Sequence, residues 1–161
     1  MGEIIGGAKK IDNNVDIWIA SHLDFPSILH YRRQYSKLGF ESIPPDRMKD
    51  EILRNNVFVF SYNAFCSGYI YISSNRRLTA RVNQLAVDED IWRNKVGSKV
   101  MWFVESVCRA NGIWGIYLMS NINWPGHYFW PALGYKMIGS ATPNTSRRSG
   151  IMSDLFFAKV I

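Results

Sequence analysis

The sequence contains little cysteine, and its two cysteines are not arranged to bind a metal ion. Cys66 and Cys108 lie far apart, and neither belongs to a Cys-x-x-Cys pair or to a Cys/His cluster. Structural metal sites need such closely spaced ligands. We therefore expect no metal site and two reduced, buried thiols, one in a strand and one in a helix.

Long apolar runs are also missing. No stretch of about 18 uncharged apolar residues, the length that a membrane helix needs, occurs in the chain. The first residues lack the pattern of a secretory signal peptide, and no internal repeat or low-complexity tract is present. We therefore expect a cytoplasmic protein that makes no membrane contact.

The residues that are present indicate one globular domain. The chain has 161 residues, of which 47% are apolar and 14% are aromatic, enough to form a sizeable hydrophobic core. Residues 1–14 are rich in glycine and have no hydrophobic periodicity. We expect a flexible N-terminal arm over residues 1–14 and a single domain over residues 15–161.

The charge balance favours anionic partners. Lys and Arg outnumber Asp and Glu by 19 to 13, which gives a net charge of +6. A basic protein attracts nucleic acids, nucleotide cofactors and acidic surfaces. A general excess of surface lysine would give the same balance, so charge alone does not choose among these partners.

The hydrophobic periods predict alternating strands and helices. Strands are expected at 15–21, 56–63, 64–73, 79–88, 113–120, 135–141 and 151–160, and helices at 24–39, 46–55, 97–112 and 123–134. This order indicates a mixed α/β (α+β) fold class. We expect a mostly antiparallel central sheet, flanked by helices, with one parallel β-α-β crossover in its middle.

Residues 83–101, NQLAVDEDIWRNKVGSKVM, pass directly from a strand into a helix. Such a turn leaves the first helical N–H groups unpaired at the positive end of the helix dipole, which suits a phosphate. Gly97 would allow a ligand to approach the backbone, and Ser98 could cap the helix or donate a hydrogen bond. Basic residues surround the turn: Arg93, Lys95 and Lys99. On these residues alone, a solvated bend explains the pattern equally well.

Together with residues 121–139, NINWPGHYFWPALGYKMIG, this segment resembles the GNAT superfamily of acyl-CoA-dependent N-acyltransferases. In that family a strand ending in L-x-V meets a turn of the type R/Q-x-x-G-x-G/A, whose amides bind the pyrophosphate of acetyl-CoA. A second segment, N-x-x-A-x-x-F-Y-x-x-x-G-F, packs beside the pantetheine. The likeness extends over residues 15–160 and implies a GNAT-like fold with acetyl-CoA as co-substrate.

The resemblance implies a set of cofactor-binding residues. The final glycine of the turn falls on Gly97, and the earlier glycine falls on Lys95 or is missing. A side chain at Lys95 could narrow the approach of the phosphates. The implied acetyl-CoA contacts are Leu85, Ala86, Val87, Arg93, Asn94, Lys95, Val96, Gly97, Ser98, Asn123 and Phe129.

The resemblance leaves the catalytic acid unassigned. Trp130 stands where many relatives have a tyrosine that protonates the leaving thiolate. An indole N–H cannot act as that acid. Tyr128 and Ser120 are the substitutes that we expect.

The catalytic base is also unassigned. Gln84 stands about where relatives have a glutamate on the central strand, and an amide cannot accept the proton. Deprotonation could then use water or another group, and the candidates by sequence are His30, Glu41 and His127. Backbone N–H groups on a bulged part of strand 82–88 would polarise the thioester carbonyl.

The leading hypothesis is direct transfer of an acetyl group from acetyl-CoA to an amine on a small molecule, a protein or a nucleic acid. One alternative rests on the pairing of LGF at 38–40 with FW at 129–130, which is similar to phage-associated members and to the Mom-type enzyme that acylates adenine in DNA. Arg147 and Arg148 would then contact nucleic acid. A non-catalytic binding module is the third hypothesis, and the aromatic content leaves a homodimer open.

Overall fold

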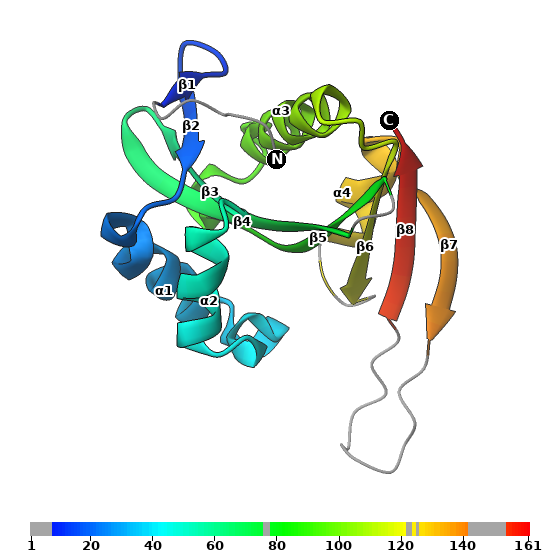
Figure 1. Cartoon of the computed structure of the whole chain (residues 1–161), viewed down its shortest axis with the longest axis horizontal. Coiled ribbons are helices and arrows are strands. Elements are labelled where there is room, and N and C mark those ends of the chain that lie inside the picture. The colour runs from blue at the N-terminus through cyan, green and yellow to red at the C-terminus, as the bar shows by residue number, and fades with distance from the viewer. Residues whose placement is uncertain (1–7, 76–77, 122–123, 125, 142–153) are drawn as a thin grey trace.

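One sheet of eight strands organises the fold. The computed structural model describes residues 8–75, 78–121, 124, 126–141 and 154–161, and within them the strands follow the order β1-β2-β3-β4-β5-β6-β8-β7 (Figure 1). The strands are β1 (Lys9–Lys10), β2 (Val15–Ile19), β3 (Val57–Tyr62), β4 (Phe65–Asn75), β5 (Thr79–Val87), β6 (Gly115–Asn121), β7 (Lys136–Ala141) and β8 (Asp154–Val160). The helices are α1 (Phe25–Gln34), α2 (Pro45–Leu53), α3 (Val96–Ala110) and α4 (Gly126–Ala132), with short 3-10 turns η1 (His22–Asp24), η2 (Ser36–Leu38), η3 (Phe40–Ser42) and η4 (Glu89–Ile91).

The sheet confirms the predicted fold class. β5 and β6 are parallel and are connected through α3, whereas the other neighbouring strands are antiparallel. The parallel register joins Thr79–Val82 to Gly115–Leu118. Both strands continue beyond these four residue pairs, so their remaining parts separate.

β5 carries a bulge at the point of separation. Tyr71 on β4 faces Gln84, but the next residue, Ile72, faces Val82, so Asn83 is one residue extra. An extra residue resets the alternation of side chains between the two faces of a strand. The bulged segment expected at residues 82–88 is therefore present.

The bulge decides which β5 side chains face α3. Before it, Ala80 and Val82 belong to the core beneath α3. After it, Leu85 and Val87 pack against that core, and Ala86 lies in a separate core. Uninterrupted alternation would have placed residue 84 beneath α3.

Each face of the sheet has its own hydrophobic core. The core under α3 and α4 includes Ile70 and Val100, both fully buried. The core under α1 and α2 includes Ile28 and Met48, also fully buried. In Figure 1, α1 and α2 lie on one side of the sheet and α3 on the other. Residues of β5 thus contribute to both cores.

Part of the expected N-terminal arm is attached to the domain. β1 pairs with β2, with Lys9 opposite Ile17. Asp12 accepts a hydrogen bond from the Val15 N–H at 2.9 Å and forms an ion pair with Lys99 on α3. Residues 1–7 lie outside the described residues.

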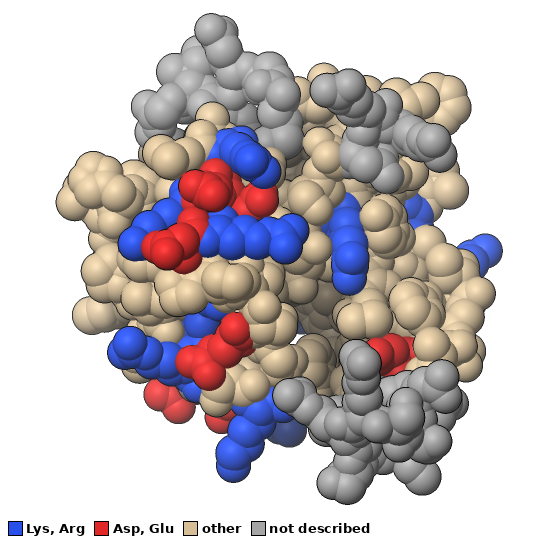
Figure 2. All heavy atoms as spheres, turned by 60° about the horizontal axis from the view of Figure 1, so that its bottom comes forward, with Lys and Arg blue, Asp and Glu red and all other residues tan. Residues whose placement is uncertain are grey.

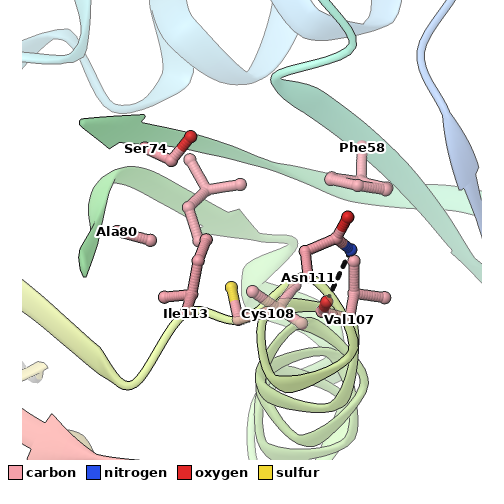
Figure 3. Close-up of a pocket in the computed structure, with 9 residues that line it drawn as sticks. Phe58, Ser74, Ala80, Val107, Cys108, Asn111 and Ile113 are labelled. Carbon is pink, nitrogen blue, oxygen red and sulfur yellow. Dashed lines mark hydrogen bonds between the residues drawn. The ribbon is translucent and has the colours of Figure 1, made fainter. Parts of the chain in front are cut away.

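Cys108 is buried, as expected. Its side chain on α3 lines an apolar gap of about 10 Å³ with Ala80 and Ile113 (Figure 3). Burial raises the pKa of its thiol to about 11. A gap of this size is at the lower limit for one water molecule, so α3 packs closely here.

Cys66 is exposed, which corrects the prediction that both thiols are buried. It lies beside the exposed Phe65 at the start of β4. Phe60 faces Gly68 while Ser61 faces Cys66, so Ser67 is an extra residue that resets the alternation. The sequence pattern gives no sign of this second bulge.

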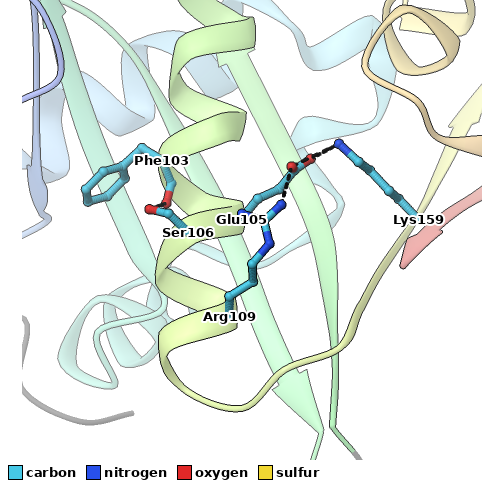
Figure 4. Close-up of polar contacts among 5 residues, drawn as sticks. All are labelled: Phe103, Glu105, Ser106, Arg109 and Lys159. Carbon is cyan, nitrogen blue, oxygen red and sulfur yellow. Dashed lines mark hydrogen bonds and ion pairs between the residues drawn. The ribbon is translucent and has the colours of Figure 1, made fainter. Parts of the chain in front are cut away.

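A buried ion pair fixes the C-terminal half of α3 to the last strand. Lys159 Nζ lies 2.9 Å from both carboxylate oxygens of Glu105, and Arg109 Nη2 lies 3.5 Å from Oε2 of the same carboxylate (Figure 4). The Glu105 side chain is only 3% exposed. Because a buried carboxylate needs partners, this contact opposes any displacement of α3 from β8.

Candidate active site

A cleft of about 800 Å³ opens where β5 and β6 separate. Its lining comes from both faces of the sheet. Val96 and Phe129 belong to the α3 side, whereas Tyr35 and Phe40 belong to the core under α1 and α2. The cleft therefore reaches from the start of α3 through the sheet to the α1 side.

The start of α3 has the backbone of an anion-binding turn. Lys95, at the N-cap, has φ 59° and makes no side-chain cap hydrogen bond. Arg93 also has a positive φ, 74°. Lys95, on which the resemblance places a glycine, therefore adopts the left-handed conformation that glycine adopts most easily. Both basic side chains are exposed and line the cleft, so they surround the uncapped N–H groups with positive charge.

Gly97 allows α3 to pack closely against neighbouring elements. A Cβ atom at this position would lie 3.3 Å from the Phe129 ring and 3.5 Å from Val87 Cγ2. Gly97 and Phe129 both line the cleft. A larger residue at position 97 would therefore enter the cleft or push Phe129 aside.

Gln84 lines the cleft, but both ends of its side chain are already hydrogen bonded. Tyr69 Oη donates to Gln84 Oε1 at 2.7 Å, and Gln84 Nε2 donates to the Phe40 carbonyl oxygen at 2.9 Å. Arg32 Nε donates to the same carbonyl at 3.1 Å. Gln84 and Arg32 thus hold the segment containing Phe40 against the sheet, and an amide used in this way has no free group for proton transfer.

Ser120 has unused hydrogen-bonding capacity. Its side chain lines the cleft, and the residue is 2% exposed. Among the residues that the structure describes, its Oγ has no hydrogen-bond partner. A Cβ at Gly126 would lie 3.0 Å from this oxygen, so the glycine leaves room for the hydroxyl.

Trp130 and Tyr128 occupy different environments. Trp130 is 7% exposed and packs edge to face against Tyr135, with ring centroids 5.4 Å apart. Tyr128 is 75% exposed at the cleft. Trp130 is therefore a packing residue of the cleft wall, while Tyr128 lies at its mouth.

An aromatic wall closes the α1 side of the cleft, and sequence reasoning did not identify it as part of the site. Tyr35, Phe40 and Trp124 line it; the Tyr35–Phe40 centroids are 5.5 Å apart and the Phe40–Trp124 centroids 6.4 Å apart. Tyr35 Oη and Trp92 Nε1 donate to the Val87 carbonyl at 2.6 and 2.7 Å. The only sequence signal was the LGF motif that contains Phe40.

The cleft brings together most of the sequence-predicted site residues. The predicted residues that line it are Gln84, Leu85, Val87, Arg93, Lys95, Val96, Gly97, Ser98, Ser120, Tyr128 and Phe129. Ala86 and Asn94 do not line it; the Ala86 side chain is buried in the core under α1 because of the bulge. Asn123 and the His127 side chain lie outside the described residues.

The other basic and acidic candidates lie elsewhere. Lys99 does not line the cleft because it pairs with Asp12. His30 and Glu41 are exposed and also do not line it. Among the described residues no group of three or more His, Cys, Asp or Glu could hold a metal ion. In the same residues no helix is long and apolar enough to cross a membrane.

Comparison with solved structures gives the same fold. Ard1 from Thermoplasma volcanium is 20% identical with a TM-score of 0.72, and the alignment covers 92% of this chain and 98% of that chain. PaiA N-acetyltransferase from Thermoplasma acidophilum in complex with coenzyme A is 16% identical with a TM-score of 0.74, covering 91% and 99%. The ribosomal-protein-S18-alanine N-acetyltransferase from Escherichia coli is 15% identical with a TM-score of 0.70, covering 91% and 94%.

Sequence comparison identifies the family. No curated protein sequence gives a significant match. The family model described as the acetyltransferase (GNAT) family matches residues 25–135, which is more than half of the chain. Neither this match nor the three structures support the narrower phage or Mom-type resemblance. The fold, the cleft at the separated strands and the family match agree that the chain belongs to the GNAT family of acetyltransferases.

Proposed function

We propose that this protein transfers an acetyl group from acetyl-CoA directly to the nitrogen of an amine acceptor. One observation carries the proposal: the cleft leads from the left-handed, basic turn at the start of α3 into the gap between β5 and β6. That combination offers main-chain donors and positive charge to a diphosphate, and an apolar channel to the pantetheine beyond it.

The residues present fit acetyl-CoA, which would supply the thioester. The N–H groups from Val96 to Ser98 would bind the pyrophosphate, with Arg93 and Lys95 adding charge. Leu85, Val87 and Phe129 would contact the pantetheine. A side chain at Lys95 in place of glycine limits how closely phosphates approach, so the amides after it would carry most of the binding.

Positioning would provide much of the rate. Holding the two reactants in line can lower a barrier by about 7 to 11 kcal/mol. The Ser120 hydroxyl can donate and accept a hydrogen bond at once, and it lines the cleft without a partner among the described residues, so it is the first candidate for protonating the leaving sulfur. The exposed Tyr128 phenol is the second candidate for protonating the leaving sulfur.

Thermal unfolding with and without acetyl-CoA tests the proposal. Acetyl-CoA is expected to raise the Tm of the wild type, because a ligand that binds only the folded state stabilises it. Gly97→Glu should abolish the increase by filling the cleft and adding a negative charge. Gly139→Glu is the matched control, since Gly139 on β7 has open space around it.

A second variant tests the same site in case Gly97→Glu does not fold. Arg93 is exposed, so Arg93→Glu should fold normally and weaken acetyl-CoA binding at least tenfold in a calorimetric titration. An undiminished affinity in both variants would place the cofactor elsewhere and contradict the proposal.

A nucleic-acid acceptor has no specific observation in its favour. On the face shown in Figure 2, Lys and Arg side chains are interspersed with Asp and Glu rather than gathered in one stripe. Arg147 and Arg148 lie outside the described residues. The net charge of +6 remains compatible with binding of the CoA phosphates alone.

A further inference from the structure

The α1 side of the cleft has the chemistry of a pocket for a flat, uncharged ring. The aromatic wall of Tyr35, Phe40 and Trp124 is extended by two more lining residues, Leu38 from the segment after α1 and Tyr128 at the mouth of the cleft. The rings of Tyr35, Phe40 and Trp124 follow one another with tilts of 48° and 43°. Tilted rings of this kind can bind an aromatic ligand through their faces and edges.

The polar groups of this wall are already engaged within the protein. Tyr35 and Trp92 donate to the Val87 carbonyl, and Gln84 is bonded at both ends. Burial, followed by the charges of Glu89 and Asp88, raises the pKa of the Tyr35 phenol, so Tyr35 keeps its proton. Among the described residues, this side of the cleft therefore offers an acceptor mainly apolar surface, together with the Ser120 hydroxyl and the Tyr128 phenol at the mouth.

Carboxylates are absent from the described residues that line the cleft. The charged residues among them are Arg93 and Lys95, both basic. Arg32, buried behind Phe40, adds a third positive charge near the α1 side. Glu89 and Asp88 lie near Tyr35 but do not line the cleft. An ammonium group in the cleft would therefore contact no carboxylate among the described lining residues.

This arrangement disfavours an alkylamine acceptor. An amine with a pKa near that of lysine, about 10.4, is neutral in only about one molecule in 2,500 at pH 7. The protonated form has no lone pair with which to attack, and the described cleft supplies no carboxylate or imidazole to remove the proton. Cation–π contact with the wall would bind the protonated form and so favour the unreactive state.

Resting on the proposed function, we propose that the acceptor is a small aromatic amine, with its nitrogen attached directly to the ring. Conjugation with the ring keeps such a nitrogen neutral at pH 7, so no general base is required before attack. The nitrogen lone pair forms the bond to the acetyl carbon, and the carbon–sulfur bond breaks with its electrons on sulfur. The proton that nitrogen loses passes to sulfur, which gives the amide and free CoA thiol.

A matched pair of acceptors tests this assignment. 4-Methoxyaniline and 4-methoxybenzylamine carry the same ring, and a single methylene separates the nitrogen from the ring in the second. Release of CoA thiol from acetyl-CoA should give a kcat/KM at pH 7 at least tenfold higher for the aniline. The aniline rate should stay level between pH 6.5 and 9, whereas the benzylamine rate should rise up to tenfold per pH unit.

Variants of Tyr128 test the wall itself, and the exposure of this residue makes both safe for folding. Tyr128→Phe should keep the preference for the aniline even if kcat falls, because the ring remains. Tyr128→Ala should raise KM for the aniline at least threefold while acetyl-CoA still raises the Tm. Loss of the preference for the aniline in Tyr128→Phe, with no further change in Tyr128→Ala, would contradict the proposal that the aromatic rings bind the acceptor.

The outcomes separate the two proposals. Faster turnover of the benzylamine, or of spermidine or a peptide with a free α-amine, at pH 7 would overturn the aromatic-amine assignment and leave acetyl transfer intact. Absence of any Tm increase with acetyl-CoA would contradict the proposed function and this inference together. Acetyl-CoA binding without turnover of either member of the pair would also overturn the inference.

Discussion

The two ends of α3 lie over the same strand, β5, but only one of them is open. At its C-terminal half, Val104 and Cys108 cover Ala80 and leave a gap of about 10 Å³. At its start, Val96 and Gly97 border a cleft of about 800 Å³ with residues 82–85 and Val87 of β5. The difference follows the pairing of β5 with β6, which covers Thr79–Val82 and then ends.

Strand pairing, rather than side-chain size, therefore creates the cleft. Where β6 lies beside β5, the helix rests on a continuous surface and packs to near-crystalline density. Where β6 moves away, no backbone fills the space, and the bulge at Asn83 redirects the following side chains.

Deleting Asn83 should remove the bulge and with it the distinction between the two ends. Tyr71 would still face Gln84 and Ile72 would still face Val82, so Gln84 should keep its hydrogen bonds, but β5 would lose the irregularity at which it separates from β6. A regular strand should narrow the cleft, so we expect the affinity for acetyl-CoA to fall roughly a thousandfold, about 4 kcal/mol, in a calorimetric titration. Asn83→Ala keeps the extra residue and should change this affinity by less than about threefold; equal losses of affinity in both variants would mean that the bulge is not decisive.

Truncating a side chain beneath the closed end of α3 should lower stability, whereas truncating one in the cleft at its open end should change KM. Ile113→Ala, at the closed end, should lower the free energy of unfolding by about 3 kcal/mol because it leaves a cavity. Met119→Ala, in the cleft, should cost under about 1 kcal/mol because Met119 is 43% exposed, and should change KM instead. Denaturation curves and steady-state kinetics measure these effects in both variants. An equal loss of stability in the two variants would contradict the proposed difference between the closed and the open end of α3.

Two left-handed residues offer a smaller comparison. Lys95 borders the open end, and Ala64 lies in the β3–β4 turn away from it, with φ of 59° and 67°. Because a side chain costs about 1 kcal/mol in this conformation, Lys95→Gly and Ala64→Gly should each stabilise the fold by about that amount. Only Lys95→Gly should change the affinity for acetyl-CoA in a titration. If both variants bound acetyl-CoA with a changed affinity, the change would not arise at the turn before α3.

The smallest effect concerns the ion pair near the open end of α3. The hydrogen bond from Lys99 holds the pKa of Asp12 below its ordinary value of 3.8. A depressed carboxyl pKa adds stability above the unfolded pKa, and this stability is lost as the pH falls through the folded pKa. The Tm of Asp12→Asn should therefore lie slightly below that of the wild type at pH 7, with the gap closing below about pH 4. A gap that persists at pH 2 would show that the charge is not the cause.

Much of the fold could be predicted from sequence because its signals are local. The alternation in 79–88 and the helical spacing in 97–112 appear as β5 and α3 with boundaries shifted by one or two residues. The Asn63–Ala64 reversal is also present, with positive φ at both residues. The basic turn before Gly97 could be located for the same reason, since its residues are contiguous.

The rest depends on pairing between distant segments. No local pattern shows that Asn83 is extra, because the bulge exists only relative to Tyr71 and Ile72 on β4. The sequence indicated that Gln84 replaces a glutamate, but the partners that occupy both its ends come from positions 40 and 69. The aromatic wall was missed for this reason too: it joins residues from positions 35 to 124.

Among strands β2 to β8, the four residue pairs between Thr79–Val82 and Gly115–Leu118 form the shortest ladder of the sheet. Within the described residues, five strands lie on one side of this seam and three on the other. Any rocking of one part against the other would concentrate its torsion there, because the ladders that join β2 to β5 on one side and β6 to β7 on the other are longer. The cleft would then widen, for entry of substrates or release of products, by rotation of the two parts about this short ladder. The strands within each part would stay paired.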